Sequence, residues 1–353
     1  MGGDHAPSAP VGGALLALQE LDAAHSIQLV GRESVVRAEL DRQLAGDFGG
    51  LRDVVAARLS IVHADEVIEM TDKPSVAIRG KPNSSMAVGL RLQPEGKSEA
   101  FVSAGNTGAQ MAASTFILRL HDGLTRPAIS TLFPTVSHPL VVLDSGANVD
   151  CSAQELVSFA RLGSVYAADI LGRQNPSVGL LSIGEEAEKG NAVVKEAHQL
   201  LRAAEGINFQ GNIEGRDLPL AASERGPIDV VVCDGFTGNV LLKFLESVGS
   251  VLLDVIKVEL PRGRRGKVGS AFLINNLRRI KKRLDHAEHG GALLLGVDGI
   301  CVIGHGSSKA LSVVSALRLA HSAASHGVME DLHALEIESR EPAAAPAAGS
   351  ITA

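Results

Sequence analysis

Short β-branched runs alternate with segments long enough for a helix, and this alternation constrains the fold more than any other feature of the sequence. The runs span 26–31, 59–64, 100–105, 128–133, 140–144, 178–183, 229–233 and 299–303. Apolar residues recur at helical spacing in 10–21, 108–120, 153–171, 189–204 and 309–324. Because strands separated by helix-length segments form βαβ units, we predict an α/β fold with a mostly parallel sheet.

The amino-acid composition favours the same fold class. Hydrophobic residues make up 45% of the 353 residues, yet aromatic residues make up only 3% and tryptophan is absent. The core must therefore consist of Val, Leu, Ile and Ala, as in parallel strands covered by helices. This length suffices for one large domain or two smaller ones. We predict one catalytic domain over 1–340 and a disordered tail rich in Ala and Pro over 341–353.

The three cysteines lie far apart and form no CxxC pair. That spacing argues against a metal cluster or a disulfide framework and fits a reducing cytoplasm. Cys233 and Cys301 lie in apolar runs, where core packing is their simplest role. Cys151 begins a predicted helix with no base beside it, so we expect no covalent acyl-enzyme there. No metal and no cofactor are expected.

Charge is distributed unevenly along the chain. The net charge is −7, but 257–283 holds ten Lys or Arg residues and one acid, which leaves 23 basic and 39 acidic residues elsewhere. The basic segment is either a solvated helix face or a docking site for an acidic protein or an anionic membrane. Nucleic acid is disfavoured by the overall negative charge and the scarcity of aromatic side chains.

Charged residues also interrupt the most apolar stretch, 240–260, which therefore does not predict a membrane-spanning helix. The chain opens without a signal peptide. We expect a cytoplasmic protein, with peripheral contact at the inner face of the membrane as the alternative location.

Polar loops rich in glycine follow five of the predicted strands. Ligands of open α/β sheets bind at the carboxyl ends of strands, where glycines and helix N-termini expose N–H groups to anions. We therefore predict one shared phosphate-handling cleft. The GxGxxG dinucleotide fingerprint and the GxxxxGK[ST] phosphate loop are both absent. The five loops are AGNTG at 104–108, DSGANVD at 144–150, IGEE at 183–186, CDGFTGN at 233–239 and GHGSS at 304–308.

These loops belong to nine ordered motifs through which the chain resembles the PlsX family of phosphate acyltransferases, from residue 1 to about residue 324. Nine motifs in the right order are a far more specific signal than any single glycine loop. They are MGGDHAP at 1–7, DKPSVAIRGKPNSSM at 72–86, SAGNTGA at 103–109, RPAI at 126–129, GANVDC at 146–151, IGEEAEKGN at 183–191, GNIEGRD at 211–217, CDGFTGNVLLK at 233–243 and HGSS at 305–308.

The resemblance implies a three-layer α/β/α fold similar to phosphotransacetylase and to the isocitrate and isopropylmalate dehydrogenases. It implies a homodimeric enzyme that transfers a fatty acyl group from acyl carrier protein to inorganic phosphate for phospholipid synthesis, with a glycerol-phosphate acyltransferase as a further partner. A dehydrogenase of the related fold is one alternative, although no metal-binding set of aspartates and no nicotinamide pocket can be assembled. A noncatalytic scaffold at the membrane is another.

Two departures from the family pattern affect this prediction. Family members usually begin with a short apolar strand ending in Asp-Ala before the Met-Gly-Gly-Asp-His motif, whereas this chain begins at Met1. We therefore expect the sheet to lack one strand, because of a late start codon or a truncated chain. The strands beside the gap would then keep unpaired backbone groups, which is costly. Ser145 stands where the family usually has an apolar residue, which we interpret as a tolerated local change.

Phosphate attack on a thioester needs no enzyme nucleophile, because phosphate supplies the attacking oxygen and the thiolate leaves readily. The protein must position the reactants and stabilise the oxyanion. We predict Asn106, His305 and Lys189 as catalytic residues. Each has an alternative role: Asn106 as a helix cap, His305 as a structural residue, and Lys189 as a first-turn residue paired with a carboxylate.

Nine more residues are predicted to bind substrate or phosphate. For Ser84 and Ser85 the alternative is a simple loop and cap, and Asn239 is interpreted as an N-cap, a ligand or both. The nine are Asp4, His5, Ser84, Ser85, Ser103, Thr107, Asn148, Asp234 and Asn239.

The basic segment divides into a loop at 261–269 and a helix whose residues Leu273, Leu277, Ile280 and Leu284 share one face. With the preceding helix it predicts a projecting helical hairpin over about 239–290. The apolar stripe is typical of a packing or dimer face. The cations suit acidic carrier protein or anionic lipid, and those predicted to contact a partner are Arg262, Arg264, Arg265, Lys267, Arg278, Lys281 and Lys282.

Overall fold

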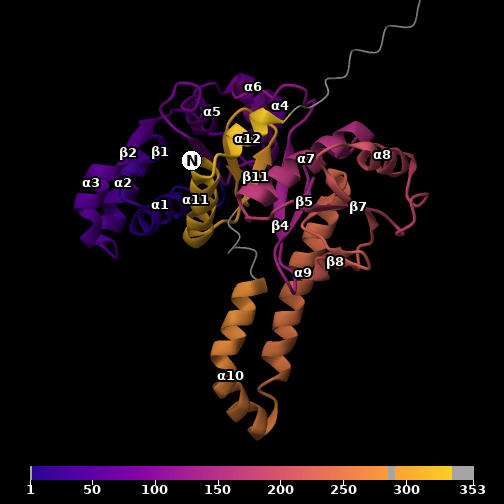
Figure 1. Cartoon of the computed structure of the whole chain (residues 1–353). Coiled ribbons are helices and arrows are strands. Elements are labelled where there is room, and N and C mark those ends of the chain that lie inside the picture. The colour runs from indigo at the N-terminus through magenta and orange to yellow at the C-terminus, as the bar shows by residue number, and fades with distance from the viewer. Residues whose placement is uncertain (1, 285–290, 336–353) are drawn as a thin grey trace, which may run out of the picture.

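The computed structural model describes residues 2–284 and 291–335 and builds them around an eight-stranded sheet (Figure 1). Its strand order is β3-β12-β11-β4-β5-β10-β6-β7. These strands are β3 (Ala100–Ser103), β4 (Ala128–Phe133), β5 (Leu140–Leu143), β6 (Ser177–Leu181), β7 (Asn208–Ile213), β10 (Val230–Val232), β11 (Ala292–Leu295) and β12 (Ile300–Ile303). Two small sheets pair β1 (Ile27–Gly31) with β2 (Leu59–His63) and β8 (Ala222–Ser223) with β9 (Gly226–Pro227).

Helices cover both faces of the eight-stranded sheet. The helices are α1 (Ser8–Glu20), α2 (Glu33–Ala45), α3 (Arg52–Arg58), α4 (Pro74–Gly80), α5 (Ser85–Arg91), α6 (Thr107–Ile117), α7 (Ala153–Asp169), α8 (Ala192–Ala203), α9 (Gly235–Glu259), α10 (Gly263–Leu284), α11 (Ala310–Ser325) and α12 (Val328–Ala334). One face is covered by α7, α8, α11 and α12, and the other by α4, α5, α6 and the first half of α9.

Alternate residues of the central strands explain this layering. In β5, Val141 and Leu143 belong to the core under α7, whereas Leu140 and Val142 belong to the core on the opposite face. Side chains of a strand alternate between the two faces, so a strand that is apolar throughout needs cover on both. The predicted three-layer α/β/α fold is confirmed.

Strand direction reverses in the middle of the sheet. Four of its seven pairings are parallel, but β11 is antiparallel to both of its neighbours and β4 is antiparallel to β5. The strands β3 and β12 therefore end at one edge of the sheet, while β5, β10 and β6 end at the opposite edge. The prediction of one shared cleft is wrong within a single chain, because it assumed that all five strands run in one direction.

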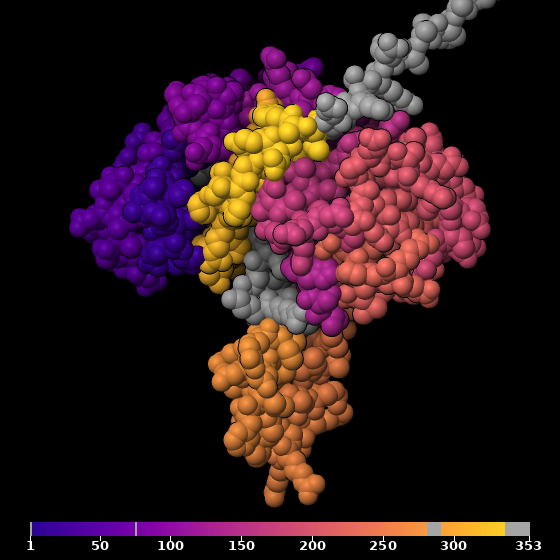
Figure 2. All heavy atoms as spheres, in the orientation of Figure 1, coloured from indigo at the N-terminus to yellow at the C-terminus, as the bar shows by residue number. Residues whose placement is uncertain are grey.

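Helices α9 and α10 form the predicted projecting hairpin (Figures 1 and 2). Figure 2 shows it standing clear of the globular body. Its connection is shorter than the predicted loop at 261–269, because α10 already begins at Gly263. Pro261, which cannot continue a helix interior, lies in the short turn between the two helices. No helix in the described residues is both long enough and apolar enough to cross a membrane.

The N-terminal segment forms a small lobe with its own apolar core, made by α1, α2, α3 and the pair β1–β2. The lobe joins the body where α1 packs against α11. Gly13 makes that approach possible, since a Cβ at this position would lie 2.4 Å from the Cβ of Val313. Two helices can meet this closely only where one of them lacks a side chain.

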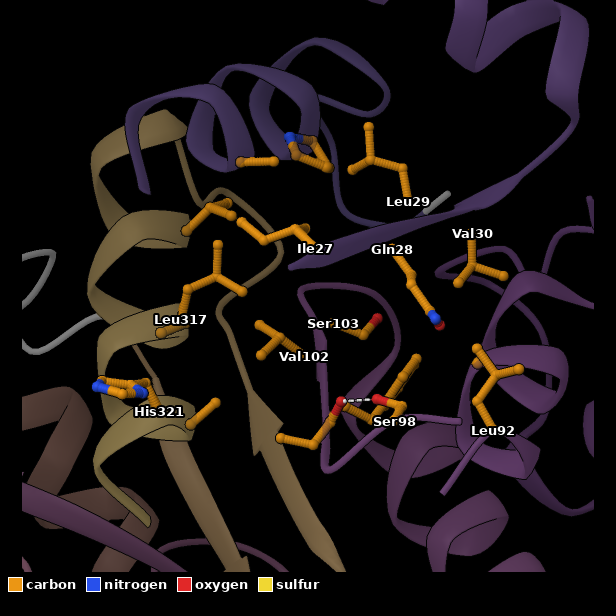
Figure 3. Close-up of a pocket in the computed structure, with 18 of the residues that line it drawn as sticks. Ile27, Gln28, Leu29, Val30, Leu92, Ser98, Val102, Ser103, Leu317 and His321 are labelled. Carbon is orange, nitrogen blue, oxygen red and sulfur yellow. Dashed lines mark hydrogen bonds between the residues drawn. The ribbon is translucent and has the colours of Figure 1, made fainter. Parts of the chain in front are cut away.

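A cavity of about 820 Å³ separates this lobe from the eight-stranded sheet. Figure 3 shows Ile27 to Val30 of β1 on one side of it and Val102 with Ser103 of β3 on another. Each of these two strands pairs with another strand along one edge, and its second edge faces the cavity. The cavity thus lies where one additional strand would join the two sheets.

An added strand should therefore stabilise the fold. A segment of five β-branched residues fused ahead of residue 1 is expected to raise the free energy of unfolding by about 2 kcal/mol, through new backbone hydrogen bonds and apolar burial. Urea denaturation measures the effect, and a Gly-Ser segment of equal length is the matched control. Equal stability of the two fusions would contradict this account of the cavity.

Candidate active site

Three loops meet at the edge of the sheet where β3 and β12 end. The Asp4 N–H donates to the Gly306 carbonyl at 2.8 Å, and the Gly304 N–H donates to the Ser103 carbonyl at 2.8 Å. Gly3, the residue before Asp4 in the N-terminal loop, has a φ of +83°, and a Cβ on it would lie 3.0 Å from the Gly306 carbonyl oxygen. The N-terminal loop can therefore reach the loop after β12 only with glycine at this position.

Asn106 fixes a fourth segment, residues 69–72, to the same place. Its Nδ2 donates to the carbonyls of Glu69, Met70 and Asp72 at 3.2, 3.3 and 3.0 Å. Its Oδ1 accepts from the Ala109 N–H at 3.0 Å, which caps α6. Asn106 is only 8% exposed, so its amide is committed to the protein itself. The capping alternative is thus correct, and Asn106 acts by positioning the loops around it.

Lys81 and Asp72 hold the other end of this segment. The Lys81 Nζ lies 2.5 Å from Asp72 Oδ2 and donates to the Val67 carbonyl at 2.9 Å. The hydrogen bond from Lys81 lowers the pKa of the Asp72 carboxyl, with a smaller contribution from the Glu69 N–H. Asp72 therefore stays ionised and keeps the loop closed. Sequence reasoning assigned Asp72 no role, although its place at the start of the DKP motif was a signal.

Of the three predicted serines, Ser84 and Ser85 are buried and Ser103 is half-buried. Ser84 is fully buried and caps α5 by accepting from the Ala87 N–H at 3.3 Å, which matches its capping alternative. Ser85 and Ser103 line the cavity between β1 and β3, and Figure 3 labels Ser103 there. The Ser103 hydroxyl also accepts from the Gly105 N–H at 3.3 Å. These side chains support the loops from beneath.

Four predicted residues are exposed at this edge: Asp4, His5, Thr107 and His305. The Nδ1 of His305 accepts from the Ser307 N–H at 3.2 Å and lies 2.7 Å from the Ser307 hydroxyl. A ring nitrogen that accepts from a backbone N–H carries no proton in the neutral imidazole. The other nitrogen, Nε2, therefore carries the proton and serves as the donor of neutral His305.

Unpaired backbone N–H groups lie in the loop of His305 and in the first turn of α6. Among the described residues, no acceptor contacts the N–H groups of Thr107 and Gly108 in the first turn of α6, or those of His305 and Gly306. Free N–H groups at a helix N-terminus and in a glycine loop favour an anion. This edge of the sheet can therefore bind phosphate or an oxyanion.

The remaining predicted ligands lie at the opposite edge. Asp234 is the N-cap of α9 and accepts from the Thr237 N–H and hydroxyl at 2.8 Å each. Interpreting Asn239 as the N-cap was wrong, because the helix begins four residues earlier at Gly235. Asn239 instead lies beside Gly146, and the Asn148 carbonyl accepts from the Gly235 N–H at 2.7 Å.

A buried carboxylate organises this second edge. Asp144 accepts from the N–H groups of Ile129, Gly146, Ala147 and Asn148, and from the Asn148 side chain at 2.8 Å. Burial raises the pKa of Asp144, and these donors oppose that shift. The Asn148 amide is thereby committed to Asp144 and to the Pro127 carbonyl at 2.8 Å. Asn148 has a structural role here.

Lys189 lies outside both groups of loops, the one that holds the unpaired N–H groups and the one around Asp144. It follows β6 in the loop after Leu181, and its N–H donates to the Glu186 carbonyl at 3.0 Å. The prediction that Lys189 and His305 face one cleft is wrong within one chain, because β6 and β12 end at opposite edges.

The predicted partner-binding cations all belong to the hairpin. Arg264, Arg265 and Lys267 lie at its tip and are exposed, while Arg262 pairs with Glu259 at 2.7 Å. Arg278 donates to the Asn275 side chain at 3.3 Å. Lys281 and Lys282 lie on α10, but their side chains are outside the described residues.

A family model described as fatty acid synthesis protein matches residues 1–331. A phosphate acyltransferase from Prochlorococcus marinus is 55% identical over 339 residues, which cover 95% of this chain and 76% of that protein. One from Synechococcus elongatus is 51% identical over 346 residues, or 98% and 94% of the two chains.

This chain belongs to the phosphate acyltransferase family. Membership makes it an acyltransferase and favours that prediction over the dehydrogenase and scaffold alternatives. A phosphotransacetylase from Streptococcus pyogenes shares the fold, with a TM-score of 0.54 and 16% identity over 89% of this chain and 98% of that one. A branched-chain phosphotransacylase from Enterococcus faecalis V583 has a TM-score of 0.51, 16% identity and coverages of 91% and 96%.

Removing the Asn106 side chain tests its positioning role. Asn106→Ala should lower the free energy of unfolding by about 2 kcal/mol, because three carbonyls and a helix N-terminus lose their partner and the φ of +30° disfavours alanine. Asn106→Asp keeps the capping oxygen but loses the three donated bonds. Hydrogen exchange of the backbone amides of 69–72 should be faster in both variants, and it should be unchanged in the control Asn83→Ala, which alters an exposed side chain. Unchanged exchange in the Asn106 variants would refute the positioning role of Asn106.

Proposed function

We propose that the protein transfers a fatty acyl group from acyl carrier protein to inorganic phosphate and so supplies acyl phosphate for phospholipid synthesis. Membership of the phosphate acyltransferase family supports acyl transfer to phosphate. The observation that carries the proposal furthest is the set of unpaired N–H groups around His305, since both phosphate and the oxyanion of the reaction need donors rather than a nucleophile.

The reaction proceeds by direct attack. An oxygen of bound phosphate attacks the thioester carbonyl carbon, and a tetrahedral oxyanion forms beside the free N–H groups of the loops after β3 and β12. The oxyanion collapses, the C–S bond breaks, and the acyl group leaves on phosphate. The Nε2–H of His305 donates a hydrogen bond to the departing sulfur, and the proton that hydrogen phosphate loses on acylation passes through solvent to the thiolate and gives the free thiol. Asp4, His5 and Thr107, which are exposed at the same edge, bind the reactants.

A covalent acyl-enzyme is not required, and the cysteines are poorly suited to one. Burial raises the pKa of Cys151 to about 12, and burial also raises the pKa values of Cys233 and Cys301. A thiol with so high a pKa holds almost no thiolate at neutral pH. The phosphate oxygen is therefore the nucleophile of the proposed reaction.

The function is tested by incubating the protein with palmitoyl acyl carrier protein. Release of free carrier protein should depend on phosphate and be matched by acyl phosphate in equal amount. His305→Gln keeps a polar side chain but loses the ring proton, and it should lower kcat about 100-fold. The exposed, distant His63→Gln should retain full activity. Carrier protein released without phosphate, or without acyl phosphate as product, would exclude the proposed function.

The hairpin is proposed to form the homodimer contact. Its helices expose a large number of apolar side chains that no described residue covers, among them Phe272 at 84% exposure and Phe244 at 67%. Exposed apolar surface of this extent marks a protein or membrane contact. We assign these faces to the hairpin of a second copy, because paired amphipathic helices bury their apolar stripes in helical bundles.

This assignment predicts a change of oligomeric state. The wild-type chain of 36.7 kDa should sediment as a dimer, and Phe244→Glu combined with Phe272→Glu should sediment as a monomer. A matched double variant, Lys243→Glu with Arg264→Glu, places the new charges at polar positions of the same helices and should remain dimeric. Wild-type protein that sediments as a monomer would contradict the assignment.

The basic tip of the hairpin is assigned to an anionic membrane surface. The 25 residues of α9 span roughly 37 Å, so Arg264 and Arg265 lie far from the sheet. The helix also starts at the edge opposite His305. A carrier protein bound at the tip would therefore hold its thioester far from the loop of His305 in the same subunit. Association with a glycerol-phosphate acyltransferase at that membrane is part of the same proposal.

A further inference from the structure

The loop between β12 and α11 carries His305 on a backbone that is held from two sides. The Asp4 N–H donates to the Gly306 carbonyl at 2.8 Å, and the Ser308 N–H donates to the His305 carbonyl at 2.9 Å. Ser308 itself is only 8% exposed. These bonds fix the loop backbone without the side chains of His305 and Ser307. What remains to be fixed is the orientation of the imidazole ring.

Ser307 restrains the ring of His305 through two donors on one nitrogen. Its N–H donates to Nδ1 at 3.2 Å, and its hydroxyl oxygen lies 2.7 Å from the same atom. Because Nδ1 accepts from the N–H, it carries no proton, and the Ser307 hydroxyl must act as a donor too. A half-turn of the ring about its Cβ–Cγ bond would break both hydrogen bonds. The two contacts therefore set the orientation of the ring and the position of its proton.

The other ring nitrogen, Nε2, is left for a reactant. The His305 ring is exposed, and among residues 2–284 and 291–335 no hydrogen bond or ion pair involves Nε2. With Nδ1 held by Ser307, the proton on Nε2 is the one that neutral His305 can donate outside its own loop. The Ser307 hydroxyl cannot donate in its place, because its own proton is already donated to Nδ1.

Two other histidines, His321 and His326, also contact a serine hydroxyl through Nδ1. The Nδ1 of His321 lies 3.3 Å from the Ser325 hydroxyl, and either atom can be the donor. The Nδ1 of His326 lies 2.8 Å from the Ser322 carbonyl, a contact that requires the proton on Nδ1. A serine hydroxyl alone therefore does not decide which ring nitrogen is protonated. At His305 the additional backbone N–H decides it.

We propose that Ser307 is a positioning residue for acyl transfer, and that its hydroxyl holds His305 with Nε2–H directed at the departing sulfur. The proposal rests on the proposed function, which assigns that hydrogen bond to His305. Ser307 acts through the ring and not on the reacting atoms. Removing its hydroxyl should leave the fold intact, because the Ser307 side chain is exposed and, within the described ranges, bonds only to Nδ1 and its own loop's ring.

Two variants of Ser307 test this role by steady-state kinetics with palmitoyl acyl carrier protein and inorganic phosphate. Ser307→Ala should lower kcat about fivefold through the loss of one hydrogen bond, with both KM values within about twofold of wild type because neither reactant loses a contact. Ser307→Thr keeps the hydroxyl and should return kcat to the wild-type value. Both variants should unfold at the wild-type urea midpoint.

Ser325→Ala is the matched control. It also removes a serine hydroxyl from the Nδ1 of a histidine, but that histidine, His321, lies on α11 outside the loops of the candidate site. The control should change neither kcat nor KM. A loss of kcat in Ser307→Ala that Ser307→Thr does not restore, or an equal loss in Ser325→Ala, would overturn the positioning role of Ser307.

Nitrogen-15 NMR of the histidine rings locates the proton independently of turnover. Wild-type protein should show His305 with its proton on Nε2, a signal assigned by its loss in His305→Gln, and Ser307→Ala should show a larger share of the form protonated on Nδ1. An unchanged distribution in a protein that makes acyl phosphate would overturn the role of Ser307 alone. Wild-type protein that shows the Nε2–H form but makes no acyl phosphate would overturn the proposed function, and the role of Ser307 with it.

Discussion

The reversal of strand direction across β11, β4 and β5 decides where every polar loop of this protein lies. Hydrogen bonding fixes the relative direction of neighbouring strands, and each strand can present its following loop only at its own carboxyl end. The loops after β3 and β12 are therefore assembled with the N-terminal loop, while those after β5 and β10 are assembled around Asp144. One chain thus carries two separate groups of polar loops.

Within the first group, structural roles account for the most buried side chains. Asn106, Ser84 and Lys81 all commit their hydrogen-bonding capacity to backbone groups or to Asp72. What remains for chemistry is mostly backbone: N–H groups at the start of α6 and beside His305. Such a site suits a reaction in which both reactants bring oxygen atoms, because rigid N–H donors stabilise negative charge without reorganising.

Much of the fold could be predicted from the sequence, because local periodicity is a property of nearby residues. All eight predicted strands exist, and the helices α1, α6, α7, α8 and α11 match the apolar spacing. The strands β7 and β11 of the eight-stranded sheet were missed, and so were the two-residue strands β8 and β9. The run Ala292–Leu295 is too short and uniformly apolar to distinguish from a helix, and Gly211 interrupts the strand Asn208–Ile213.

The candidate site was harder to predict, since its assembly depends on pairing between distant strands. No local pattern reveals that β11 lies antiparallel between β4 and β12, and so the loops at Lys189 and His305 were assigned to one cleft.

The central claim, that a phosphate oxygen is the nucleophile that attacks the acyl carbon, is tested most sharply by isotope labelling. Phosphate labelled with ¹⁸O at every position is supplied with palmitoyl acyl carrier protein, and the acyl phosphate is weighed by mass spectrometry. Direct attack predicts that the product retains every labelled oxygen, because no P–O bond breaks. Loss of one label would mean that a carboxylate attacked phosphorus instead, and it would contradict the account.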